Sequence, residues 1–115
     1  MNALTNRVQL IGNLGATPEV KQTETGKKLL RMSIATHETY TNATGEKVKE
    51  TQWHQVVAWG KAADIAEQLL TKGTHVAIEG KLVSRQYTDK DGNKKYITEV
   101  QLGELLVLDS LKDKD

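Results

Sequence analysis

Apolar and polar residues alternate with a period of two along most of this chain, which predicts strands with two different faces. The alternating segments are residues 7–13, 29–39, 49–59, 75–87 and 95–108. Residues 61–70 instead follow helical spacing, with one apolar stripe. The pattern therefore predicts an all-β protein with five strands and one short helix between the third and fourth strands.

Turn residues mark where this chain reverses direction. Residues 42–46 and the pair Asp91-Gly92 predict hairpins between neighbouring strands. Five strands with a single helix in that place are typical of the five-stranded Greek-key barrel called the OB-fold. A small antiparallel sandwich is the alternative, because alternation alone does not show whether a sheet closes.

The same pattern assigns side chains to the core or to the surface. The residues expected inside, from the second strand and the helix, are Leu30, Met32, Ile34, Ala62, Ile65, Ala66 and Leu69. On the second strand we expect Arg31, Ser33 and Ala35 to point outward. Gly73 stands where the helix should end.

The last predicted strand carries aliphatic residues on both faces. One face would hold Leu102, Leu106 and Leu108, and the other Leu105 and Val107. The outer face of a lone small barrel should be polar, so we expect another copy of the chain to cover it. The alternative is an amphipathic tail that folds back on its own barrel.

The bulk composition fits one cytoplasmic domain. The chain has 115 residues, and we place the domain at residues 1–110 and a short charged end at 111–115. Cysteine is absent, which excludes disulfides and thiolate zinc sites, and no apolar run suits a membrane. The net charge is only +1. Bases nevertheless gather between Lys81 and Lys95, whereas acids such as Glu99, Glu104 and Asp109 are expected elsewhere.

Trp53 and Trp59 lie six residues apart in one predicted strand. Because six is even, both indoles should leave the same strand face, together with Gln55 and Val57. Two further rings, Tyr40 and Tyr87, end neighbouring strands, and all four rings are expected to point outward. The bases near them in sequence are Lys61, Lys81 and Arg85.

Exposed rings edged by bases are suited to nucleic acid. Rings stack with nucleobases for about 1–3 kcal/mol per base and with little sequence preference. Lysine and arginine hold the phosphates and release counterions. The alternative is that these aromatics are ordinary core or interface residues.

No pattern in the chain indicates catalysis, a metal site or a cofactor site. His37, His54 and His75 lack the spacing of metal ligands, so a metal-dependent hydrolase is not expected. The Gly12-x-x-Gly15 segment lacks the rest of a phosphate loop, and no nucleophile elbow is present. We therefore expect a protein that is not an enzyme.

Several motifs resemble the family of bacterial single-stranded DNA-binding proteins. They are VQLIGNLG from residue 8, TQWHQVV from residue 51, WGK from residue 59, KG from residue 72, VxIEGxL from residue 76 and YTDxxG from residue 87. They occur in the family's order and spacing. The resemblance implies an OB-fold, usually a homotetramer, that wraps single-stranded DNA in the bacterial cytoplasm, at the nucleoid, during replication, recombination and repair.

The resemblance also implies roles for individual residues. The positions of the family's stacking aromatics are Tyr40, Trp53, Trp59 and Tyr87, and those of its phosphate-contacting bases are Arg7, Lys61, Lys72 and Arg85. His54, whose strand parity is opposite to that of the tryptophans, matches a histidine at a subunit interface. We assign Val8 and Leu10 to the same expected interface.

The chain departs from the family pattern in two ways. Tyr40 and Tyr87 stand where members often have Trp, and Trp59 where many have Phe, so stacking should persist with altered strength. The chain ends at residues 111–115, where the family usually continues with a flexible linker and an acidic tip. Replication and repair proteins are candidate partners, although the acidic tip through which the family recruits them is absent from residues 111–115. The alternative function is an OB-fold replication-restart (primosomal) interaction module with secondary nucleic-acid binding.

Overall fold

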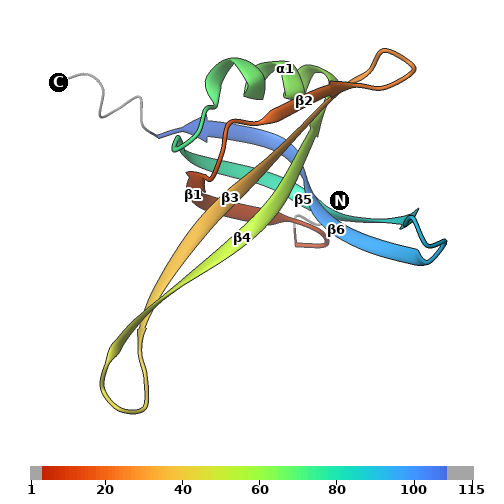
Figure 1. The fold of residues 1–115 in the computed structure, drawn as a ribbon. Helices are drawn as coiled ribbons and strands as arrows, with labels where there is room; N and C mark the ends of the chain where they lie inside the picture. Colours follow the sequence, from red (N-terminus) through yellow and green to blue (C-terminus); the bar gives the residue numbers. More distant parts are fainter. Residues whose placement is uncertain (1–3, 109–115) are drawn as a thin grey trace.

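Five strands close into a barrel, and one helix covers an end of it (Figure 1). The computed structural model describes residues 4–108, so Asp109, the domain boundary at residue 110 and the charged end lie outside the described part. The elements are β1 (Val8–Leu14), β2 (Glu19–Gln22), β3 (Lys28–Thr41), β4 (Lys47–Trp59), α1 (Gly60–Leu69), β5 (His75–Thr88) and β6 (Lys94–Val107).

The strand order is β1-β5-β6-β4-β3, and β1 pairs again with β3 to close the sheet. This closure confirms the predicted OB-fold and excludes the sandwich. One short strand was missed, because β2 pairs along the outer edge of β3 and has only four residues. So short a segment carries almost no periodic signal.

The barrel interior confirms most of the inward assignments. The buried residues contributed by the long strands include Leu30, Met32, Ile34, Val56, Ala58, Val76, Ile78, Val100 and Leu102. Ala35 has the expected outward parity, because it pairs with Trp53, but it is only 4% exposed. It lies directly between Trp53 on β4 and Asn13 on β1, and these neighbours cover its small side chain.

The helix buries a different stripe from the one predicted. Ala63 and Ala66 are buried, whereas Ile65 and Leu69 are 44% and 51% exposed. The segment also satisfies helical spacing through Ala63, Ala66 and the following Leu70, and that set faces the barrel. Apolar spacing alone was compatible with both rotations of the helix.

An ion-pair cluster holds α1 against β3. Lys28 Nζ lies 2.7 Å from Asp64 Oδ1 and 2.8 Å from Glu67 Oε1. The hydrogen bonds that the Lys28 ammonium donates to Asp64, the larger effect, and to Glu67 raise the pKa of Lys28 from 10.5 to about 12. Both carboxylates leave the same side of α1, so these contacts favour the observed rotation of the helix.

Gly73 does not end the helix, which stops at Leu69. Gly73 instead has a φ of +88° and lies third in a turn that the Thr74 amide closes by donating to Thr71 O at 3.1 Å. A positive φ at this turn position favours glycine. Gly73 therefore belongs to a separate turn that leads into β5, and the prediction that it ends the helix is wrong.

The aliphatic pattern of β6 results from a β-bulge. Glu79 pairs with Glu104 and Gly80 pairs with Leu102, so Gly103 is an extra residue. The residues that face or pack against the core on either side of the bulge are Val100, Leu102, Leu105 and Val107. The prediction of two apolar faces was therefore wrong, and it no longer supports self-association. Leu106 alone among these aliphatics is largely exposed, at 62%.

Two long hairpins extend beyond the barrel (Figure 1). In the β3–β4 hairpin, Asn42 Oδ1 accepts hydrogen bonds from the amides of Thr44 and Glu46 at 3.0 and 2.9 Å. In the β5–β6 hairpin, Asp89 Oδ1 accepts from the amides of Asp91 and Asn93 at 3.0 and 2.9 Å. Both predicted hairpins are thus confirmed, and side-chain acceptors fix both turns.

Candidate nucleic-acid interface

Four strands form one continuous outer face of the sheet. A single row across β3, β4, β6 and β5 consists of Arg31, Val57, Gln101 and Lys81, because each is paired with the next. Residues that lie an even number of positions from this row along the same strands point to the same side of the sheet, which we call the outer face. It comprises Arg31, Ser33, Trp53, Gln55, Val57, Trp59, Lys81, Val83, Arg85, Tyr87, Glu99 and Gln101.

Both indoles lie at the surface on this face. Trp53 is 58% exposed and Trp59 is 37% exposed. The Trp53 ring lies against Gly15, where an added Cβ would come within 2.5 Å of Trp53 Cζ3. Gly15 therefore lets the β1–β2 connection approach the ring closely, which holds the indole on the surface.

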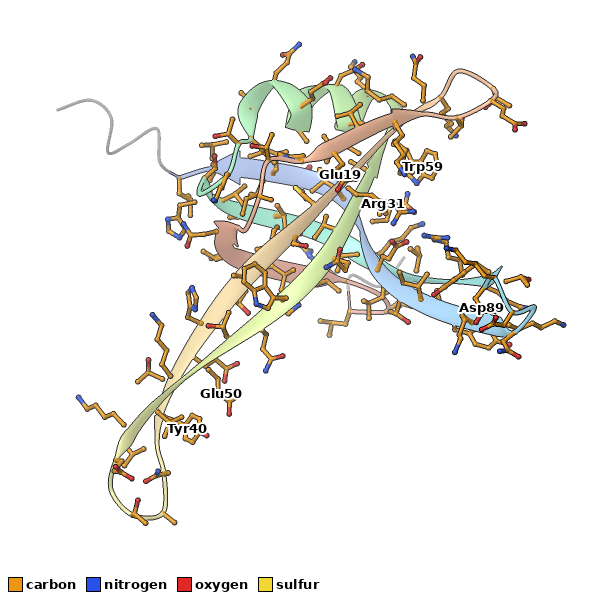
Figure 2. The ribbon with its side chains drawn as sticks, viewed as in Figure 1. Glu19, Arg31, Tyr40, Glu50, Trp59 and Asp89 are labelled. Atoms are coloured by element: carbon orange, nitrogen blue, oxygen red, sulfur yellow. The ribbon has the colours of Figure 1, made fainter. Side chains whose placement is uncertain are left out.

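A hollow adjoins each indole. The hollow beside Trp53 has a volume of about 360 Å³ and includes Arg31, Ser33 and Gln55 in its lining. The hollow beside Trp59 has a volume of about 520 Å³, and Lys27 Nζ lies 5.6 Å from the indole centroid. Each site combines a flat ring with a cation. Figure 2 shows Arg31 and Trp59 close together at the end of the barrel that β2 reaches.

An acidic residue joins two arginines in the middle of the outer face. Glu99 Oε2 lies 2.7 Å from Arg31 Nη1, and Glu99 Oε1 lies 3.1 Å from Arg85 Nε. The Glu99 side chain is only 2% exposed. The expectation that Glu99 lies apart from the bases is therefore wrong. Sequence reasoning also omitted Arg31 from the site, although its outward parity was recognised.

The ion pair with Glu99 explains a buried residue on this face. Arg31 belongs to β3 and Glu99 to β6, with β4 between them. The arginine must therefore cross β4 beside Val57, its own cross-strand partner. Val57 is accordingly only 4% exposed despite its outward parity.

The other bases are distributed unevenly around the two indoles. Lys81 lies opposite Gln101, which lines the Trp59 hollow, and Lys61 lies in the first turn of α1. The Lys72 amide donates to Thr17 Oγ1 at 3.3 Å, and Thr17 lines the Trp53 hollow. Arg7 lies elsewhere, where its Nε is 2.8 Å from Glu79 Oε2, and both residues line a separate hollow.

Tyr40 and Tyr87, the two tyrosines predicted for the site, lie on different faces of the sheet. Tyr87 is 46% exposed and lies on the outer face, two residues beyond Arg85. Tyr40 is 45% exposed, but it pairs with Val48 and so shares strand parity with His54. The expectation that all four rings share one outward parity is therefore wrong for Tyr40.

The β3–β4 hairpin has different charges on its two faces. Glu38 and Glu50 pair with each other and share the parity of Tyr40, and Figure 2 shows Tyr40 and Glu50 near the far end of this hairpin. Lys47 and Lys49 have the parity of Trp53. Sequence reasoning did not include these lysines, although their even spacing from Trp53 was a usable signal.

The residues expected at a subunit interface lie away from the indoles. His54 is half-buried on the opposite face of β4, and its Nε2 lies 2.9 Å from Thr36 Oγ1. Val8 and Leu10 are partly buried and pack against the barrel core. Each therefore retains some surface, but none of them adjoins the outer face.

Residues 4–108 show neither a metal-binding cluster nor a membrane-spanning helix. Among them, no group of three or more histidine, aspartate or glutamate side chains could hold a metal ion. No helix in the same range is long and apolar enough to cross a membrane.

Similar proteins were found by sequence. "Single-stranded DNA-binding protein 1" of Xylella fastidiosa is 41% identical over 111 residues, which cover 96% of this chain and 82% of that protein. The protein of the same name from Chlorobaculum tepidum is 43% identical over 104 residues, covering 90% of this chain and 64% of that protein.

Solved structures of the same type share the fold. The Plasmodium falciparum SSB in complex with ssDNA has a TM-score of 0.82 and 32% identity, covering 95% of this chain and all of that one. A deletion mutant of the single-stranded DNA binding protein from Thermus aquaticus has a TM-score of 0.78 and 33% identity, covering 90% of this chain and 50% of that one. Residues 5–108 match the single-strand binding protein family, and the chain belongs to that family.

Proposed function

We propose that this protein binds single-stranded DNA without sequence preference and is not an enzyme. It coats and protects the strand during replication, recombination and repair. The observation that carries the proposal is the pair of exposed indoles on one face of β4, each beside a hollow and a cation. Every nucleobase has a flat π-face, so such rings accept any sequence.

The two indoles serve different nucleotides. Trp53 and Trp59 are six residues apart on an extended strand, which places their backbones about 20 Å from each other. That separation far exceeds the width of one base. The bound strand therefore runs across the outer face between them, where Arg31 and Arg85 can reach its phosphates.

Tyr87 extends the same path onto the β5–β6 hairpin, and Lys81 lies on the same face of β5, six residues before Tyr87. Lys61 and Lys72 are phosphate contacts at the margins, near Trp59 and near the Trp53 hollow. Tyr40 and Arg7 lie off this direct path. They contact DNA only if the strand wraps beyond the outer face.

The active form is a homotetramer in the cytoplasm, associated with the nucleoid, with His54, Val8 and Leu10 at subunit interfaces. Their position away from the indoles supports this role, since assembly would leave the outer face accessible. Sedimentation with and without oligo-dT measures the subunit number and the binding stoichiometry together. A monomer under both conditions would refute the tetramer without affecting DNA binding.

Filter binding at low salt tests the function directly. Oligomers of dT, dA and dC of equal length should bind with similar affinity, and a duplex of that length should bind much more weakly. Absence of single-strand binding, or a preference for duplex, would contradict the proposal. Weak binding of single strands together with tight binding of another replication protein would instead support the replication-restart module. The likeness to single-stranded DNA-binding proteins does not favour that alternative.

A further inference from the structure

A buried carboxylate is an unexpected component of a surface that attracts a polyanion. Glu99 is the buried charged residue among the described residues, and it lies in the middle of the outer face. Burying a charge is costly unless it is paired. Glu99 is paired with an arginine at each of its oxygens, at 2.7 and 3.1 Å.

The two arginines remain able to bind a further anion. Their side chains are 36% and 45% exposed, for Arg31 and Arg85 respectively. Each contacts Glu99 through one nitrogen, Nη1 in Arg31 and Nε in Arg85. A guanidinium has five N–H donors, so donors of both residues are left for a phosphate.

The three side chains form one unit across the sheet. Arg31 comes from β3, Glu99 from β6 and Arg85 from β5, so the ion pairs fix two flexible cations relative to each other. Arg31 also lines the Trp53 hollow, and Gln101, two residues beyond Glu99, lines the Trp59 hollow. The unit therefore lies between the two indole sites.

The charge of this unit is lower than its arginines alone would give. Two guanidinium groups and one carboxylate sum to a formal charge of +1. We propose that Glu99 bridges Arg31 and Arg85 within one phosphate-binding unit and, by lowering the charge of that unit, limits the electrostatic part of DNA binding. This inference rests on the proposed function. A carboxylate that only stabilised the barrel would affect melting but not the salt dependence of binding.

Glu99→Gln tests the inference, because the amide keeps the shape of the side chain and removes its charge. Affinity for oligo-dT is measured at several salt concentrations for the wild type and the variant. For single strands, each additional phosphate contact steepens the plot of log affinity against log salt by about 0.7. The variant should bind more tightly than the wild type at low salt. The ratio of the variant's affinity to that of the wild type should fall about 2.6-fold when the salt concentration rises fourfold.

Glu67→Gln is the matched control. It makes the same change of charge and also removes a carboxylate from an ion pair, but on α1, where it contacts Lys28. Its plot should run parallel to that of the wild type. Parallel plots for Glu99→Gln would overturn the inference and leave the proposed function intact. Absence of wild-type binding would overturn both.

Arg31→Gln keeps the inference testable if Glu99→Gln fails to fold, which a thermal melt would reveal. In this variant Glu99 retains Arg85 as its partner, so the carboxylate is not left unpaired. The plot should become shallower by about 0.7, because one phosphate-binding cation is lost. An unchanged slope would overturn the proposal that Arg31 belongs to the phosphate-binding unit.

Discussion

Replacing Trp53 by alanine should weaken DNA binding while the fold survives. Trp53 is 58% exposed, so about two fifths of its surface is buried against Gly15 and its neighbours. A large aromatic buries at most about 250 Å². About 100 Å² is therefore lost, which costs at most about 2.5 kcal/mol of folding free energy at 25 cal/mol per Å².

The effect on binding follows from the loss of one stacking platform. One stacked base contributes about 1–3 kcal/mol, so the Kd for oligo-dT should rise about 5- to 150-fold. His54→Ala is the control, because His54 is the next residue on β4 and faces the opposite side. It removes a 2.9 Å contact with Thr36 but no stacking ring.

Anisotropy of a labelled oligo-dT, measured well below each variant's melting temperature, gives the three Kd values. Trp53→Ala should bind clearly more weakly than His54→Ala, which keeps every stacking ring. The reverse order would place the DNA on the wrong side of β4. Equal, wild-type-like values for both variants would show that this indole does not stack on bases.

Three further outcomes can be measured with the same methods. Tyr87→Ala should weaken oligo-dT binding several-fold. Tyr96→Ala should not, because the Tyr96 ring, which is 74% exposed, lies on the other face of the same hairpin. Equal effects of the two substitutions would refute this assignment of faces. Tyr40→Ala should weaken binding less than Trp53→Ala, and a larger effect would show that the strand follows the opposite face of the β3–β4 hairpin. Because folding raises the pKa of Lys28 from 10.5 to about 12, its stabilising effect should be complete below pH 10.5 and lost as the pH rises through 12. The melting-temperature difference between the wild type and Lys28→Met should shrink over that range, and a constant difference would contradict the ion pairing.

Alternation predicted the fold well where a strand is regular. β4 has no bulge along its pairing with β3, so counting from Trp53 to Trp59 assigned both indoles to the correct face. β6 contains Gly103 as an extra residue, which reverses parity for everything that follows. A glycine inside a strand is a known sign of a bulge, so this signal was present in the sequence.

The parts that failed depend on contacts between distant segments. Arg31 and Glu99 are 68 residues apart, and their contact requires the β3-β4-β6 order that local patterns do not specify. Tyr40 is an exception, because its face could have been counted along its own strand: it lies six residues after Ile34 on β3, which has no bulge, and so shares the parity of the residues expected inward. The rotation of α1 was ambiguous because its neighbouring alanines satisfy two apolar stripes.

The central claim is that single-stranded DNA stacks on Trp53 and Trp59. These are the only tryptophans in the chain, so intrinsic tryptophan fluorescence reports on both sites. Titration with oligo-dT at low salt should quench this fluorescence strongly and to saturation, and an equal amount of duplex should quench it little. An unchanged emission throughout the oligo-dT titration would contradict the account.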